Sequence, residues 1–270
     1  MMSLLKSPEM VRVENQLISL FDHTMERAFR LRTTGYEREL VHNVRREFDS
    51  KTYVKQLDNI ITAIIKQSLL YADNQLKQMS TAAIEDSYVI TEEAVRISTE
   101  LADNVVESIV HMFKDDAIYT THPNQLARRI VESWEGERYK AVRFARTFTA
   151  DVATNTTVYR YRQRGVEYVE FDAELDDRTS DQCRALHGTV FDLSKGSVDL
   201  YRPPLHHSCR SGLKIISIHQ QIDTDKLFEN RDFSSYEKAF KEIDVFNKKY
   251  RINKFVLDAD IETRLAGMKT

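Results

Sequence analysis

Hydrophobic positions recur at three- and four-residue steps through two long stretches of the chain. The first stretch runs from Leu57 to Met79 and the second from Ile90 to Met112. This spacing places the apolar side chains on one face of an amphipathic helix. Neither glycine nor proline occurs between residues 36 and 122. The pattern therefore predicts a mostly helical N-terminal body made of long helices, with each apolar stripe packed into a core.

The first clear break in the helical pattern lies at Thr121-His122-Pro123-Asn124. A proline disfavours helix at the residue before it and often lies near the start of a new helix. We therefore expect one helix over roughly residues 125–133 and another over roughly 137–161, with Gly165 ending the second.

From Gly165 onward the apolar period changes from about 3.6 residues to about two, which is the period of a strand. Residues 166–173 alternate and are rich in aromatic and β-branched side chains, as are the short segments 189–191 and 213–218. Both features favour strands. Four of the seven glycines also fall in this region, so turns concentrate there. The last fifty residues are again charged and helical in pattern.

Together these patterns predict an α+β fold in three parts. We expect a helical domain over residues 1–125, a small α+β module with a short antiparallel sheet over 126–218, and a helical tail over 219–270.

Composition excludes several classes of protein. Only 7 glycines and 4 prolines are present, too few for a turn-rich sandwich or propeller. No run approaches the roughly 20 apolar residues of a membrane span, and the first residues lack the apolar region of a signal peptide. Two cysteines do not make a disulfide scaffold. We therefore expect a soluble protein made in a reducing cytoplasm.

Charge is nearly balanced, with 39 basic and 42 acidic residues, but it is unevenly placed. Seven basic residues lie between positions 138 and 164, against Asp151 alone. Four of them could follow DNA phosphates without sequence preference: Arg138, Lys140, Arg143 and Arg146. The alternative is a solvated helix face paired with acidic helices nearer the N-terminus. The near-zero net charge favours this alternative, because dedicated nucleic-acid binders are strongly basic.

Residues 176–213 carry the candidate chemistry, since they contain both cysteines and three of the eight histidines. The pairs Cys183-x3-His187 and His206-x2-Cys209 could supply four ligands to a tetrahedral zinc ion. Two buried reduced cysteines and a Cys183–Cys209 disulfide are the alternatives. None of the three is decided by the spacing.

Catalytic interpretations of the same residues have less support. A cysteine nucleophile with a histidine base is one, but no flanking residues match a known nucleophile turn. An HNH-type nuclease built on His206 and His207 with Asn230 is another. It requires a metal-binding histidine on a following helix, whereas His219, the last histidine of the chain, precedes Asn230.

The same segment resembles the phage Mu F-like minor head proteins, which are phage head morphogenesis proteins. The resemblance covers roughly residues 126–218 and rests on a composite motif. The motif consists of Asp176-Asp177-Arg178-Thr179-Ser180, Cys183, Leu186-His187-Gly188 and Pro203-Pro204-Leu205-His206-His207-Ser208-Cys209-Arg210-Ser211. Ala145-Arg146-Thr147 resembles the helix that precedes it. Phe148 and His187 depart from the expected pattern, which has Glu and Asp there.

The resemblance implies that the motif is a structural staple and holds no catalytic residue. Arg178, Thr179 and Ser180 would set a turn whose hydroxyls cap a short helix. Asp176 or Asp177 would pair with Arg210, and His206 would bridge Cys183 and Cys209 through hydrogen bonds or a metal. The residues assigned to the staple are Asp177, Arg178, Thr179, Ser180, Cys183, Gly188, Pro204, His206, Cys209 and Arg210.

The resemblance also implies a function and partners. We expect a minor capsid protein of a tailed bacteriophage, located inside the head near the portal and acting in head morphogenesis, genome packaging or delivery. Its partners would be the portal protein, a capsid or scaffolding protein and, without sequence preference, viral DNA, but no membrane. The alternative is a metal-dependent nuclease or another enzyme carried in the particle.

Overall fold

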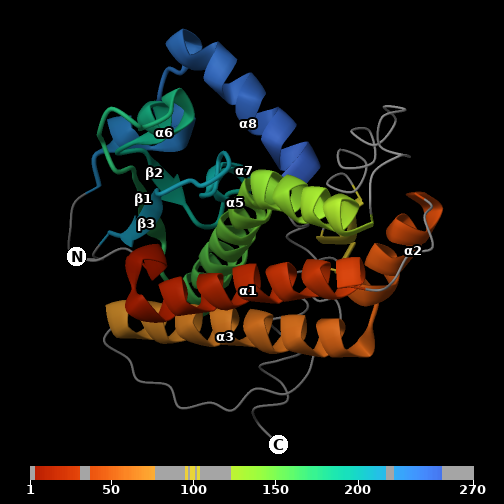
Figure 1. Ribbon diagram of the computed structural model, residues 1–270. Helices are drawn as coiled ribbons and strands as arrows, with labels where there is room; N and C mark the ends of the chain where they lie inside the picture. The colour runs from red at the N-terminus through yellow and green to blue at the C-terminus, as the bar shows by residue number, and fades with distance from the viewer. Residues whose placement is uncertain are drawn as a thin grey trace, which may run out of the picture. The chain divides into compact units, whose positions relative to one another are not determined.

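The computed structural model describes residues 4–30, 37–76, 95–96, 98–100, 102–103, 123–216 and 222–250. Its helices are α1 (Pro8–Arg30), α2 (Glu37–Phe48), α3 (Lys51–Gln75), α5 (Pro123–Gln163), α6 (Asp181–Leu186), α7 (Ser197–Tyr201) and α8 (Glu237–Tyr250) (Figure 1). The strands are β1 (Tyr168–Asp172), β2 (Val190–Asp192) and β3 (Gly212–Ile215). Short 3-10 turns lie at Leu4–Lys6, Thr224–Lys226, Phe228–Asn230 and Ser234–Tyr236.

The helices agree with the sequence in part. The first apolar stripe lies on α3 as far as Gln75, with Leu57, Ile61 and Ile65 among its buried residues, and its last member, Met79, lies outside the described residues. Most of the second stripe, residues 90–112, lies outside the described residues. The expectation of two helices between 125 and 161 is wrong, because α5 is continuous through Gly136. A lone glycine costs only about 1 kcal/mol relative to alanine in a helix, and its charged neighbours are good helix formers.

Three short strands form one antiparallel sheet in the order β2-β1-β3. Val169 is opposite Phe191 on one side and Ile215 on the other. Alternate residues of β1, Val169 and Phe171, are fully buried, whereas the positions between them are half-buried. This is the period of two that the sequence predicted, and the α+β class is confirmed.

Contacts divide the chain into two units, and the long helices contribute to both. One unit comprises residues 14–60 and 88–145. Its core includes an aromatic group in which the Phe48 ring lies 4.9 Å from that of Phe21 and 4.8 Å from that of Tyr53. The other unit comprises residues 1–13, 61–87 and 146–270 and contains the sheet. The domain limits expected from the sequence stay a prediction.

The core of the sheet-containing unit lies between the sheet, α6 and the C-terminal part of α5. Its buried members include Val158, Tyr161, Phe171, Phe191 and Leu205. Both cysteines also belong to this core. The small module thus packs against a long helix, which adds to its apolar burial, since a three-stranded sheet alone is too small to be stable.

The last part of α5 is buried on every side, with each residue from Thr147 to Tyr161 inside the protein. Many of these residues are polar. The hydroxyls of Thr156 and Thr157 donate to carbonyl oxygens one turn earlier, at 2.8 and 2.9 Å, so they need no outside partner. Arg160 donates two hydrogen bonds to the buried Asp73 on α3, at 2.8 and 2.7 Å.

A second buried ion pair joins α5 to the segment after α7. The side chain of Arg202 is 0% exposed and that of Asp151 is 3% exposed. Arg202 Nη1 donates to Asp151 Oδ1 at 2.6 Å. Charges this deep in a protein are tolerated only when they are paired, because each has lost its hydration.

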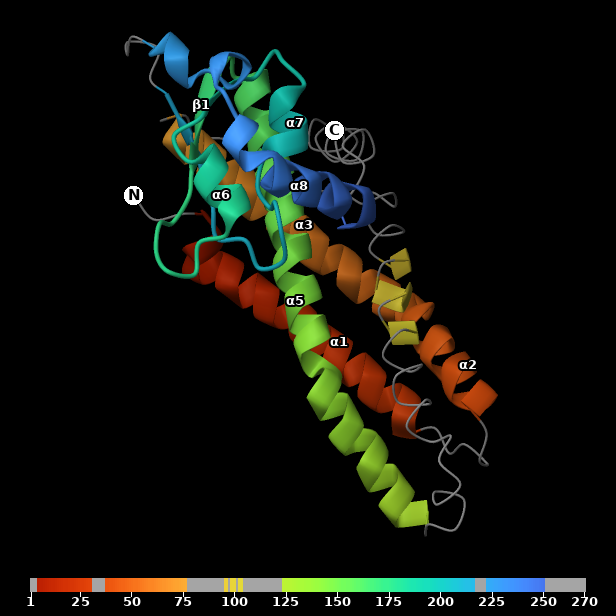
Figure 2. The ribbon, with the colours of Figure 1, turned by 90° about the horizontal axis from the view of Figure 1, so that it is seen from above.

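Helix α8, part of the predicted helical tail, lies beside α6 in both ribbon views (Figures 1 and 2). Gln182 on α6 hydrogen-bonds to Glu242 on α8. The His207 ring lies 5.5 Å from the ring of Phe246 and 4.2 Å from that of Tyr250. The tail therefore covers the loop that carries the second half of the motif. Among the described residues, no helix is long and apolar enough to span a bilayer.

We predict that Asp151→Asn lowers the free energy of unfolding by about 3–5 kcal/mol, because it leaves the Arg202 charge buried without a carboxylate. Equilibrium urea denaturation measures the loss. The matched control is Glu237→Gln, which removes an exposed ion pair of similar length, 2.7 Å to Lys241, and costs about 0–1 kcal/mol. Equal small losses in both variants would contradict the prediction.

Candidate functional site

The first half of the motif is a turn that leads into α6. The backbone N–H of Arg178 donates to Asp176 Oδ1 at 2.9 Å, and Thr179 Oγ1 accepts from the Asp176 N–H at 2.7 Å. Ser180 is the N-cap of α6, and its hydroxyl accepts from the Cys183 N–H at 3.3 Å. These hydroxyl and carboxylate contacts satisfy backbone donors that a short helix leaves open. They fix where Cys183 lies.

Gly188 follows α6 and has a φ of +72°. Glycine adopts this left-handed conformation without steric cost, so it is suited to the position after a helix. Its N–H donates to the Phe171 carbonyl at 2.9 Å, which returns the chain to the sheet.

The second half of the motif is a compact loop between α7 and β3. The Pro203–Pro204 peptide bond is cis, and Ser208 has a φ of +56°. The Ser208 N–H donates to Thr147 Oγ1 on α5 at 3.4 Å. On this loop His206 and Cys209 lie against Cys183 of α6.

Arg210 and Asp176 join the two halves. Arg210 Nη1 donates to Asp176 Oδ2 at 2.8 Å, and Nη2 donates to Oδ1 at 2.7 Å. Glu174 is a second acidic neighbour, 3.3 Å from Arg210. The paired hydrogen bonds from Arg210 hold the pKa of the Asp176 carboxyl well below its usual range. Of the two aspartates expected as partners, Asp176 makes this pair, and Asp177 is exposed.

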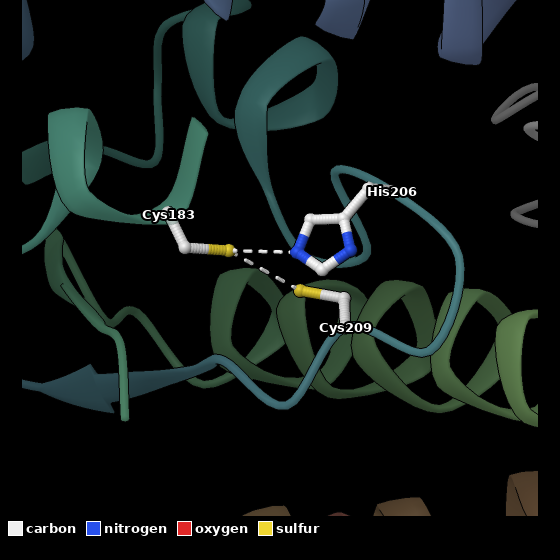
Figure 3. A group of neighbouring side chains, drawn as sticks. All are labelled: Cys183, His206 and Cys209. Atoms are coloured by element: carbon white, nitrogen blue, oxygen red, sulfur yellow. Dashed lines mark hydrogen bonds between the residues drawn. The ribbon is translucent and has the colours of Figure 1, made fainter. Parts of the chain in front are cut away.

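Three soft donor atoms meet where α6 approaches this loop (Figure 3). Cys183 Sγ lies 3.3 Å from His206 Nε2 and 3.6 Å from Cys209 Sγ. All three donor atoms lie within 4.8 Å of one another. Both cysteines are free thiols and both are buried. The structure thus brings together three of the four residues considered as zinc ligands.

The fourth, His187, is not part of this cluster. Its Nδ1 accepts a hydrogen bond from the Ala173 N–H at 3.1 Å. His187 is the C-cap of α6, after the helix has carried Cys183 inward. The four-ligand set expected from the spacing is therefore reduced to Cys183, His206 and Cys209, because the end of α6 turns His187 toward the strand β1.

The three side chains of the cluster shift one another's pKa values. The contact between the two thiols and their burial raise the pKa of Cys183, whereas hydrogen bonds from Cys183 and His206 lower the pKa of Cys209 against the opposing effect of burial. Burial alone would lower the pKa of His206, but its hydrogen bond and charge interaction with Cys209 outweigh burial and raise it.

Several basic residues in α5 and just after it have acidic partners within their own unit. Arg138 donates to Asp22 at 2.8 and 2.6 Å. Three other members of the basic stretch 138–164 also form ion pairs. Arg160 and Arg164 pair with Asp73, and Arg162 pairs with Asp199. The guanidinium of Arg143 lies over the Tyr139 ring. These contacts agree with the interpretation of the basic stretch as a helix face whose cations pair with acidic side chains. DNA contact by Arg138, Lys140, Arg143 or Arg146 stays a prediction.

Two features of the site gave no signal in the sequence. One is the Asp151–Arg202 pair, whose members are 51 positions apart. The other is a cavity of about 560 Å³ next to Arg210, whose wall includes Tyr71, Asp172 and Lys214. The Lys214 ammonium lies 2.8 Å from Asp172 Oδ1. No local pattern links residues so far apart, so sequence spacing could not have found either feature.

Comparison with known protein families gives a match that covers both halves of the motif. Residues 119–214 match the family model of phage Mu protein F like proteins. The chain carries a phage Mu protein F-like segment. The match confirms the resemblance that the composite motif indicated, over nearly the same residues. Comparisons with curated proteins and with solved structures gave no match.

We predict that Asp176→Asn destabilises the Mu F-like segment near neutral pH and that the difference from the unaltered chain disappears in acid. The folded state lowers the pKa of Asp176, so its stabilisation is complete above the unfolded value of about 4 and is lost as pH falls below it. Thermal unfolding of both proteins across a pH series measures this. Asp177→Asn is the matched control, and a constant difference at every pH would contradict the assignment.

Proposed function

We propose that this protein is a minor head protein of a tailed bacteriophage that lies inside the head near the portal and acts in head morphogenesis. The observation that carries the proposal is the composite motif within the Mu F-like segment, residues 119–214. Phage head morphogenesis is the role that this family suggests.

The contacts of the motif residues support a structural role. Arg210 and Asp176 neutralise each other, Ser180 caps α6, and Cys183 and Cys209 belong to the apolar core. The ion pair, the helix cap and the two cysteines thus each hold one part of the motif in place against another. Catalytic groups instead have to face a substrate within hydrogen-bond reach, and buried core positions do not offer that access.

The proposed partners are the portal protein and a capsid or scaffolding protein, with viral DNA as a non-specific third. The candidates for phosphate contact on α5 are the four that the sequence suggested: Arg138, Lys140, Arg143 and Arg146. A phosphate that contacts Arg138 would have to displace Asp22 from it.

We predict that the protein sediments with heads that contain the portal, at a few copies per particle. Quantitative mass spectrometry across density-gradient fractions of the producing host's lysate measures its ratio to the portal and major capsid proteins. A phage-encoded non-structural protein serves as the control for trapped soluble material. Recovery of the protein only in the soluble fractions, like that control, would contradict the proposal.

The structural role also predicts how motif variants behave. We expect Cys183→Ser and His206→Ala to lower the free energy of unfolding by about 1–3 kcal/mol, because each replaces a side chain that contacts others inside the motif. We expect no cleavage of double-stranded DNA by the unaltered protein with Mg²⁺, Mn²⁺ or Zn²⁺. Variants that keep their stability but lose a DNA-cleaving activity of the unaltered chain would instead identify a nuclease.

A further inference from the structure

We propose that Cys183, His206 and Cys209 bind one zinc ion, which fastens α6 to the loop between α7 and β3. The proposal is independent of the role in the phage head, because it rests only on the three donor atoms and their surroundings.

The distances between the donors match those of a tetrahedral zinc site. With Zn–S bonds of about 2.3 Å and Zn–N bonds of about 2.0–2.1 Å, two sulfurs lie about 3.8 Å apart and a sulfur and a nitrogen about 3.6 Å apart. The structure has 3.6 Å between the sulfurs and 3.3 Å between Cys183 Sγ and His206 Nε2. These two separations are thus each within a few tenths of an ångström of the tetrahedral values, and the third lies within 4.8 Å.

The orientation of His206 favours metal binding. Its Nδ1 lies 2.9 Å from the His207 carbonyl oxygen, which can only accept, so Nδ1 must carry a proton. In the neutral ring the lone pair is then on Nε2, the atom that faces the two sulfurs (Figure 3). Metal-binding histidines are usually held in this way, with the second nitrogen donating to a carbonyl or carboxylate.

Charge and burial also favour zinc over the alternatives. Two thiolates and one neutral imidazole around Zn²⁺ form a neutral group, which suits the buried position of Cys183, 2% exposed, and Cys209, 6% exposed. A disulfide requires a sulfur separation near 2.05 Å, so the two sulfur atoms would have to approach each other by roughly 1.5 Å. Soft thiolate and imidazole donors select zinc over magnesium or calcium.

Three protein ligands leave one of the four tetrahedral positions for a water molecule. The two other histidines of the motif are engaged elsewhere, His187 with the Ala173 N–H and His207 against Tyr250. Because both thiols must lose their protons on binding, uptake of the ion releases protons and stabilises the folded state.

The test is the zinc content of the full-length, untagged protein purified without chelator. Elemental mass spectrometry is expected to find about one zinc ion per chain, and close to none in Cys209→Ser. His187→Ala is the matched control and is expected to keep the ion, which also tests the three-ligand assignment.

A second measurement uses the unaltered chain, since a cysteine variant can fail to fold. After zinc is exchanged for Co²⁺, absorption is expected to show thiolate-to-cobalt charge-transfer bands and the intense visible bands of a four-coordinate site. Removal of the metal by a chelator is expected to lower the melting temperature and to expose both thiols to a thiol reagent.

Three results would overturn the proposal. The first is a protein without zinc whose Co²⁺ form lacks the charge-transfer bands. The second is an intact mass, measured without reductant, that is lighter by two hydrogens and so reveals a Cys183–Cys209 disulfide. The third is loss of the ion in His187→Ala with full retention in Cys209→Ser. The gradient experiment is unaffected by any of these outcomes.

Discussion

A single buried guanidinium, that of Arg202, positions the loop on which the rest of the site depends. Arg202 directly precedes Pro203 in the sequence, and its Nη1 donates a hydrogen bond to Asp151 in the fully buried part of α5. Because an unpaired charge is so costly in a protein interior, the loop has one low-energy position against α5. From that position His206, Cys209 and Arg210 follow within eight residues and face α6 and the turn before it.

The two halves of the motif then meet through contacts of different chemistry. The Arg210–Asp176 pair is charged and partly exposed. The cluster of Cys183, His206 and Cys209 is mostly buried, and its donor atoms are sulfur and imidazole nitrogen. The first contact depends on pH through a carboxyl group, and the second brings together two thiols and an imidazole. A small sheet of three short strands gains stability from contacts that hold its flanking segments together, because its own buried apolar area is limited. The motif thus builds the segment by which the Mu F-like family is identified.

The basic stretch 138–164 shows how cations that lie together in the sequence can have separate acidic partners in the fold. Seven cations on one stretch of sequence suggest a phosphate-binding face, yet four of them form ion pairs with acids distant in sequence. Arg160 and Arg164 share Asp73, which the sequence places on a different helix.

The sequence by itself determined the features that depend on local periodicity and residue type. The stripe on α3, the alternation in β1 and the capping role of Ser180 all follow from spacing, because neighbours along the chain are neighbours in a helix, strand or turn. The composite motif likewise identified the segment that matches the family. Tertiary structure decided what distant residues share: the continuity of α5 through Gly136, the exclusion of His187 from the cysteine cluster, and the choice of Asp176 over Asp177. Those outcomes depend on packing and burial, since the energy of each contact is set by partners that no local pattern specifies.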